Sequence, residues 1–188
     1  MNTPAHAMLN LALLGRKARP EQALPILLGS LLSDLPMFLF YAWFRLVEGK
    51  PDSLIWTEIY FQPGWQALFD LFHSLPLILV GLALVWRSGS RWWTALFAGM
   101  ALHIPEDFFL HNEDAHRHFY PFWDWRFRSP VSYWDPHHHG RIAAPIEAAV
   151  VLGCCALLLM RYRALWVRLA VGSVMVAYAL FFSMALWA

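Results

Sequence analysis

The chain has 188 residues, of which 59 % are hydrophobic, and its formal net charge is +1. An ordinary globular domain is about 45–50 % apolar, so this composition is typical of a membrane protein. The nearly neutral charge and the lack of a basic stripe argue against a nucleic-acid partner. The length predicts a single membrane domain over residues 1–188.

Apolar runs and their stop signals predict six helices in chain order. Thr3 is expected to cap a short N-terminal half-helix with Pro4 at its first position, which ends near Gly15 and cannot span a bilayer. Longer helices are expected at 23–44, from 65 or 71 to 86, and at 92–109, 142–160 and 165–187. The expected fold is therefore all-α: a polytopic integral membrane helical bundle with about five transmembrane helices.

Two long stretches separate these helices. Residues 45–66 are polar, and residues 111–141 form a long extramembrane loop rich in aromatic residues, histidine and proline. Loops of this length are usually functional or disordered, and the aromatic density argues against disorder. We therefore expect the second stretch to be an ordered loop with a role in function.

Basic residues gather in the three short connections between the predicted helices. They are Arg16, Lys17 and Arg19, then Arg87 and Arg91, then Arg161, Arg163 and Arg168. The positive-inside rule places these connections in the cytoplasm and both long stretches outside. The prediction is a protein integral to a bacterial-type inner membrane, with its site open to the periplasm.

Acids and histidines lie inside these apolar segments, where an ionisable group is costly unless it is paired or bound. Counting about 1.5 Å per helical residue from the basic ends, five of them from four helices fall in one slab roughly 8 Å thick. They are His6, Asp34, His73, His103 and Asp107. Histidine and carboxylate are ligands of divalent metals such as zinc. The sequence therefore predicts an intramembrane metal site.

His103 and Asp107 form the motif HxxxD, whose side chains meet on one helix face. His111 would extend this stripe by one turn if the helix continued. The alternative to metal ligation is a hydrogen-bonded polar pair in the core. Pro36, Pro76 and Pro105 each lie near a candidate ligand. They either kink the helices around a hydrated cavity or are ordinary prolines of transmembrane helices without a role in the site.

The order of these residues carries a resemblance to a known family. His6 in TPAH, Asp34 in GSLLSDLP, His73 in FHS and then HxxxD resemble the YdjM-type membrane-bound metal-dependent hydrolases. The ligand order alone is also similar to that of the all-helical, zinc-dependent phospholipase C family. The resemblance implies one metal among Asp34, His73, His103 and Asp107, with Asp107 bridging to a second ion held partly by His6.

The chain departs from the family pattern at two places, and both weaken the expectation of a second ion. Pro36 stands where the family usually has an acid, and the His-Arg pair upstream of the family's THS is absent, which leaves Asp70. Asp70 lies one turn before His73 and is expected to orient its ring, as outer carboxylates do for metal-bound histidines. His111 is expected to be a second outer partner of the ligands.

The loop and the helix after it supply further candidates. Arginine side chains are fork-shaped donors that suit a phosphate, so a substrate-binding role is expected for Arg117, Arg126, Arg128 and Arg141. The alternative is a lid whose charges face water. Residues 137–139 form a histidine run that is either solvated or adds a ligand. Glu147 could be a general base, a partner of Arg141 or a ligand.

Three functions fit these features. The first is a membrane-embedded zinc-type hydrolase of a phosphoester or other ester in a lipid or phosphorylated small molecule. It would use one divalent ion, or two, with Asp34 or Glu147 accepting a proton from water. The second is a proton- or ion-coupled transporter that uses the same acids and histidines. A transporter predicts an open path to both faces, but the basic halves of two spans, residues 24–33 and 92–102, contain no ionisable residue. The third is a membrane protein with a structural metal. The sequence does not predict an oligomeric state.

Overall fold

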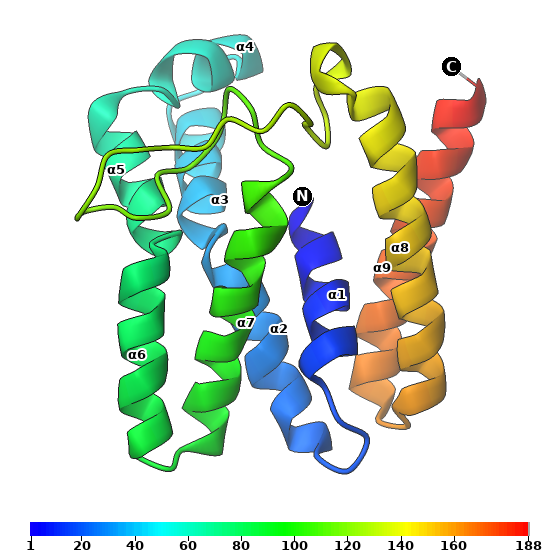
Figure 1. Ribbon diagram of the computed structural model, residues 1–188. Coiled ribbons are helices and arrows are strands. Elements are labelled where there is room, and N and C mark those ends of the chain that lie inside the picture. Colours follow the sequence, from blue (N-terminus) through cyan, green and yellow to red (C-terminus); the bar gives the residue numbers. More distant parts are fainter. Residues whose placement is uncertain (188) are drawn as a thin grey trace.

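The computed structural model describes residues 1–187, with side chains described to residue 181. This part of the chain is all-helical and contains no strand, which confirms the expected all-α class. The N-terminal helix α1 (Thr3–Leu14) lies inside the bundle rather than at its edge (Figure 1). It packs against α2 (Ala23–Leu32), α7 (Arg91–Phe108) and α8 (Gly140–Arg161).

Two of the predicted helices are broken near their middle. The predicted helix over 23–44 is α2 followed by α3 (Leu35–Ala42), and the two segments of this pair are bent by 58°. The predicted helix ending at residue 86 is α5 (Pro63–Phe72) followed by α6 (Leu75–Arg87). A proline is the second residue after each break, where its missing N–H and its ring interrupt the helical hydrogen bonds. Pro36 and Pro76 therefore mark helix breaks, as the first of the two interpretations of the prolines expects.

The polar stretch 45–66 is largely helical, which the sequence did not predict. It contains the wide turns η2 (Trp43–Val47) and η3 (Ile55–Ile59), with α4 (Asp52–Leu54) between them. Apolar side chains of this stretch pack onto α3 and α5 in a buried cluster of Phe40, Ile55, Ile59, Tyr60 and Phe69. This packing holds the stretch against one end of the bundle, with most of its other residues exposed.

The second long stretch crosses the same end of the molecule as an irregular chain (Figure 1). Apart from the single turn η4 (Pro136–His138), residues 110–139 form no helix, and α8 begins at Gly140. After α8, the chain turns back into α9 (Leu165–Trp187), which packs along α8. The one remaining short element is η1 (Pro20–Gln22), which leads into α2.

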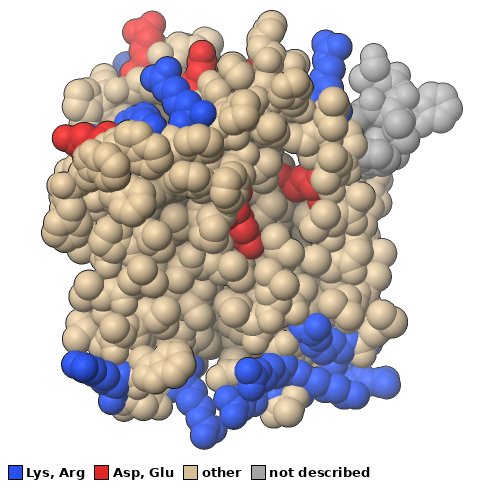
Figure 2. All heavy atoms as spheres, viewed as in Figure 1, with Lys and Arg blue, Asp and Glu red and all other residues tan. Residues whose placement is uncertain are grey.

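The three short basic connections lie together at the opposite end of the bundle from the two long stretches (Figure 1). In Figure 2, Lys and Arg form a band at that end, while most of the visible face above it is neither basic nor acidic. The expected grouping of the connections into a basic end and a long-loop end is therefore present in the fold.

Length and composition mark two described segments as able to cross a membrane: Pro63–Arg87, which is α5 and α6 taken together, and α8, Gly140–Arg161. A third is added if the bent pair Pro20–Leu32 and Leu35–Val47 counts as one span. The described apolar part of α9, Leu165–Phe181, is shorter. The structure thus supports two or three candidate spans, fewer than the five expected.

Helices α2 and α7 approach each other closely through two glycines. A Cβ atom at Gly29 would overlap the Leu96 carbonyl, and one at Gly99 would lie 2.7 Å from the Ile26 oxygen. Only glycine allows this separation of the two backbones. The close approach brings the end of α2 next to the part of α7 that carries His103.

Candidate metal centre

Four of the expected ligands form one buried group in the half of the bundle that faces the long stretches. Asp34 comes from the break between α2 and α3, His73 from the break between α5 and α6, and both His103 and Asp107 from α7. Each offers one ligand atom, and these atoms all lie within 4.8 Å of one another. The group could hold a metal ion.

The spacing of these atoms fits a single small ion. His73 Nε2 lies 3.4 Å from Asp34 Oδ1 and 3.6 Å from Asp107 Oδ2, and His103 Nε2 lies 3.5 Å from Asp34 Oδ1. A tetrahedral zinc site with bonds of about 2.0–2.2 Å holds its ligand atoms about 3.3–3.6 Å apart. The remaining distance, 2.8 Å between His103 Nε2 and Asp107 Oδ2, is shorter than this range.

The protonation of the two histidines can be derived from their other ring nitrogen. His73 Nδ1 lies 2.9 Å from the Phe69 carbonyl, and His103 Nδ1 lies 2.9 Å from the Ser30 carbonyl. A carbonyl oxygen only accepts, so in both rings Nδ1 donates, and in the neutral ring Nε2 carries a lone pair. These Nε2 atoms are buried without a hydrogen-bond partner in the described structure, although they face carboxylates.

A lone pair facing a carboxylate oxygen is unfavourable unless a positive charge lies between them. Either a second proton on each ring or a metal ion among the four atoms supplies that charge. Anchoring Nδ1 on a carbonyl or a carboxylate while Nε2 faces inward is the usual arrangement of metal-binding histidines. The residues present therefore fit a divalent ion.

Two further histidines repeat this arrangement on the other oxygen of Asp107. His6 Nδ1 lies 2.5 Å from Glu106 Oε2, and His6 Nε2 lies 2.9 Å from Asp107 Oδ1. His111 Nδ1 lies 2.9 Å from Asp114 Oδ2, and His111 Nε2 lies 3.1 Å from Asp107 Oδ1. Asp107 thus presents one oxygen to His73 and His103 and the other to His6 and His111, a geometry suited to a bridging carboxylate.

The Met1 nitrogen lies against this second oxygen. It is 2.7 Å from Asp107 Oδ1 and 3.0 Å from His111 Nε2. An ion between His6 and His111 would have to share Oδ1 with this nitrogen. His111 lies beyond the end of α7 at Phe108, so the helix does not continue to it. The i, i+4 contact between His111 and Asp107 is nevertheless made.

The break in the first bent pair frees the Asp34 side chain for the site. Asp34 is the N-cap residue of α3, but its carboxylate accepts no hydrogen bond from the backbone of that helix. Instead, Oδ1 faces the two histidines and Oδ2 accepts a hydrogen bond of 2.5 Å from Thr3 Oγ1. Both oxygens are therefore fixed, one by the cluster and one by α1.

The break beside His73 is held by the long loop. The Leu75 amide donates to the His118 carbonyl at 2.8 Å, and the Ser74 hydroxyl donates to the Tyr120 carbonyl. Ser74 Oγ also accepts from the Leu77 amide. A broken helix leaves backbone groups without partners inside an apolar bundle, and the loop supplies them here.

Asp70 does not contact His73, contrary to the sequence expectation. Its carboxylate accepts from the Arg117 backbone amide at 2.9 Å and from Arg117 Nε at 2.5 Å, and it lies 3.4 Å from His116 Nδ1. His116 stacks on the His73 ring, with 3.8 Å between the ring centroids. Asp70 therefore anchors the loop, and its link to His73 runs through His116.

The four loop arginines divide into two pairs. Arg117 is held by Asp70 and lies over the Tyr120 ring, and Arg126 lies 4.0 Å from the Asp70 carboxylate. Arg128 and Arg141 are exposed and form no ion pair with a described residue. Of the four expected substrate-binding arginines, Arg128 and Arg141 therefore have guanidinium groups that are free to bind a phosphate.

The two acids considered as bases lie in different positions. Glu147 accepts hydrogen bonds from the Asn2 side chain at 2.7 Å and from the Tyr178 hydroxyl at 2.8 Å, so it reaches the cluster only through the residues before α1. Glu106, which the sequence interpretation passed over, is in contact with His6, and its Oε1 is buried without a described partner. Glu106 is thus closer to the cluster than Glu147.

Two loop groups next to the cluster have shifted pKa values. Burial raises the pKa of Asp114, but hydrogen bonds from His111 and Trp134 outweigh burial and bring the pKa to about 2. Burial lowers the pKa of His118 to about 3, and the charges of His116 and His73 act in the same direction. At neutral pH, Asp114 is therefore a carboxylate beside His111, and His118 is uncharged.

Several contacts of the centre were missed from the sequence. Thr3, Glu106 and Asp114 each carried a weak signal, because each is adjacent in sequence or one turn away from a predicted ligand. His116 and His118 carried a signal only as members of a histidine-rich loop. The run at 137–139 is not part of the four-residue group: residues 137 and 139 are exposed, and the side chain of His138 pairs with Asp135 at 2.5 Å.

Comparisons of the chain with known protein families, with curated proteins and with solved structures find no match.

Proposed function

We propose that this protein is a membrane-embedded, metal-dependent hydrolase that acts on a phosphoester or another ester of a lipid-type substrate. The observation that carries the proposal is the shared orientation of four buried histidines. Each has Nδ1 anchored on a carbonyl or a carboxylate and Nε2 directed at Asp34 or Asp107. This arrangement favours a divalent ion, with zinc as the preferred metal for a set of imidazoles and carboxylates.

A divalent ion at this centre would lower the pKa of a water molecule and stabilise the charge that develops on the scissile group. The residues of the chain would supply the remaining functions. Asp34 would position the ion through Oδ1. Glu106, whose Oε1 has no described partner, would be a third candidate for the proton acceptor, in addition to Asp34 and Glu147. Arg128 and Arg141 would bind the phosphate.

Membrane embedding is part of the same proposal. Many large apolar side chains are exposed on the helices, among them Leu39, Val80, Leu84, Ile146 and Met160. Large apolar side chains exposed in this number mark contact with a membrane or with another protein. Together with the candidate spans and the basic end, it favours a bacterial-type inner membrane with the centre nearer the periplasm.

The orientation can be tested by labelling cysteines in intact cells. The natural residues Cys154 and Cys155 are first replaced by Ala, and a cysteine is then introduced by Glu113→Cys or by Ser88→Cys. We expect a membrane-impermeant reagent to label the first and not the second. Labelling of the second alone would place the basic end outside and overturn the proposed orientation.

The hydrolase is tested with protein purified in detergent and supplied with zinc or manganese. Phospholipids, prenyl phosphates and generic phosphodiesters are offered, and release of phosphate or head group is followed. We expect turnover that is lost in His103→Ala and kept in His137→Ala, since the second residue lies away from the cluster. Turnover that persists in His103→Ala, or no release from any substrate with metal bound, would contradict the hydrolase.

A structural metal is the second candidate, and one observation favours it. The buried group supplies four protein ligands, which is the complement of a closed structural zinc site, whereas catalytic sites usually keep one position open. Catalysis would therefore require a fifth ligand position or the departure of one carboxylate. Bound metal without turnover in the assay above would select this candidate.

A further inference from the structure

A pocket at the basic end of the bundle has no role in the proposed hydrolase. It has a volume of about 350 Å³ and lies between the connection from α1 to α2 and the start of α7. Arg91 and Asp107 are both on α7, 16 residues apart, which corresponds to about 24 Å along a helix. The pocket is therefore separate from the candidate metal centre.

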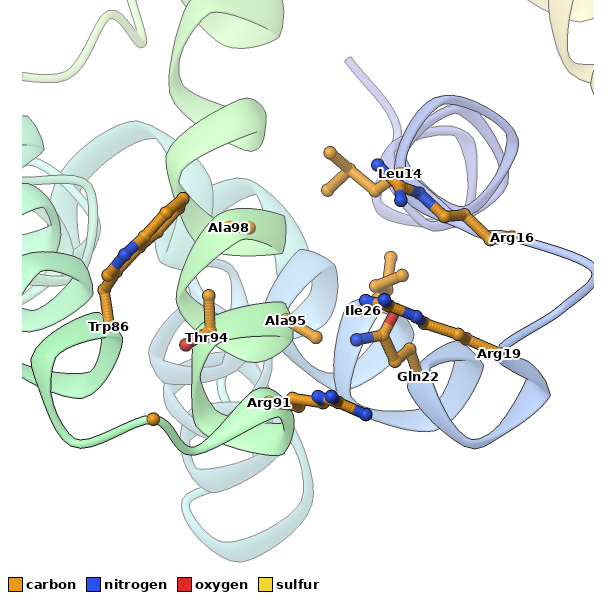
Figure 3. Close-up of a pocket in the computed structure, with 11 residues that line it drawn as sticks. Leu14, Arg16, Arg19, Gln22, Ile26, Trp86, Arg91, Thr94, Ala95 and Ala98 are labelled. Carbon is orange, nitrogen blue, oxygen red and sulfur yellow. The ribbon is translucent and has the colours of Figure 1, made fainter.

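Three arginines line this pocket from separate segments. Arg16 and Arg19 lie in the connection after α1, and Arg91 is the first residue of α7. Figure 3 shows their side chains extending toward the same space, with Gln22 and Thr94 also on its wall. Three guanidinium groups that converge from different segments repel one another unless an anion lies among them.

None of the three arginines forms an ion pair with an acid in the described part of the chain. The acid nearest to them in sequence, Glu21, is exposed and is also without a described ion pair. The pocket therefore presents three forks of hydrogen-bond donors and no carboxylate to neutralise them. This is the chemistry that recognises a phosphate group.

The rest of the wall is apolar. Leu14, Ile26, Ala95 and Ala98 line the side toward the middle of the bundle, and the exposed Trp86 stands at the rim. The pocket lies where one candidate span begins, at Pro20, and another ends, at Arg87. The pocket thus has arginines at its entrance and an apolar wall toward the middle of the bundle. This arrangement suits an amphiphile whose head group contacts the arginines and whose apolar part contacts the wall.

We propose that this pocket binds the phosphate of an anionic membrane lipid, with Arg16, Arg19 and Arg91 as its ligands. The lipid is favoured over a soluble phosphate because the apolar wall continues from the arginines toward the bundle. The site is distinct from the hydrolase and its test does not depend on turnover.

Native mass spectrometry of the detergent-purified protein tests the proposal. The bound fraction is measured with phosphatidylglycerol, with phosphatidylcholine and with glycerol phosphate. We expect the triple variant Arg16→Gln, Arg19→Gln, Arg91→Gln to bind phosphatidylglycerol at least about tenfold more weakly, with an unchanged melting temperature. The single variants Arg16→Gln and Arg91→Gln, both at exposed positions, should each lose part of this affinity.

A matched control separates the pocket from the general positive charge of this end. Lys17→Gln, Arg87→Gln, Arg163→Gln removes the same charge from exposed residues that do not line the pocket, and should weaken binding by less than about threefold. Equal losses in both triple variants, or equal binding of the two lipids by the wild type, would overturn the proposal. Displacement of the lipid by an equal concentration of glycerol phosphate would keep the phosphate site but overturn the lipid.

Discussion

The bundle delivers candidate ligands in two ways, from an unbroken helix and from broken ones. Helix α7 carries His103 and Asp107 one turn apart, so their proximity follows from helical geometry alone. Asp34 and His73 lie where helices stop, and each break needs outside partners for its backbone. The comparison teaches that α7 is the rigid side of the centre, whereas the other side depends on α1 and the long loop.

The largest effects are expected on the unbroken helix. His103→Ala and Asp107→Asn should each abolish metal binding, because Asp107 contacts four histidines and His103 is anchored on α2. An ion that binds only the folded state stabilises it by mass action, so the melting temperature should fall by about 10 °C. Metal content and thermal unfolding would be measured together. Full metal content with unchanged melting would make the pair a polar contact of the core.

The broken helices can be challenged by restoring the helical backbone. Pro36→Ala returns an N–H that can bond to the Leu32 carbonyl, which favours a straight helix and moves Asp34 out of the cluster. We expect metal affinity to fall by about tenfold or more. Pro145→Ala in α8 is the matched control, since that helix carries no member of the four-residue group. Equal effects of the two substitutions would show that the break does not position Asp34.

These two sides also differ in how far the sequence predicts them. The contact of His103 with Asp107 was predictable from spacing, and the approach of Asp34 and His73 from their similar depth in the bundle. The breaks themselves were seen only as prolines. At the break beside His73, the loop carbonyls that accept hydrogen bonds come from 118 and 120, far along the chain, so their contribution could not be predicted. The tie between Asp70 and Arg117 was unpredictable for the same reason.

The next effect concerns the carboxylates that anchor the outer histidines. Glu106→Gln and Asp114→Asn weaken the hydrogen bonds to His6 and His111 without removing a direct ligand of the four-residue group. Substitution of such outer partners typically costs about 10–100-fold in metal affinity. If a single ion binds among the four central residues, the loss of metal affinity should be near the low end of this range. If a second ion binds as well, the loss should be larger and the metal titration curve should be biphasic.

A neighbouring acid gives the control for this experiment. Glu113 is exposed and adjacent to Asp114, so Glu113→Gln changes the same charge without touching a histidine. It should leave metal affinity unchanged. A loss equal to that of Asp114→Asn would mean that net charge, rather than the contact with His111, determines affinity.

The smallest effect is expected for the hydrogen bonds between the long loop and the break beside His73. Ser74→Ala removes the cap of α6 and the bond to the Tyr120 carbonyl, and should cost about 1 kcal/mol of stability, or about 2–4 °C in melting temperature. Ser90→Ala at the start of α7 is the control, because its side chain does not cap that helix. Indistinguishable melting of the two variants would contradict a role of the loop in holding the break.

The most direct test of the central claim is elemental analysis of protein purified after expression with ample metal. The account predicts at least about one zinc or similar divalent ion per chain in the wild type and in His137→Ala. It predicts near loss of the ion in the double variant His73→Ala, His103→Ala. Less than about 0.2 ion per chain in the wild type, or equal metal in the wild type and the double variant, would contradict a metal centre at this cluster.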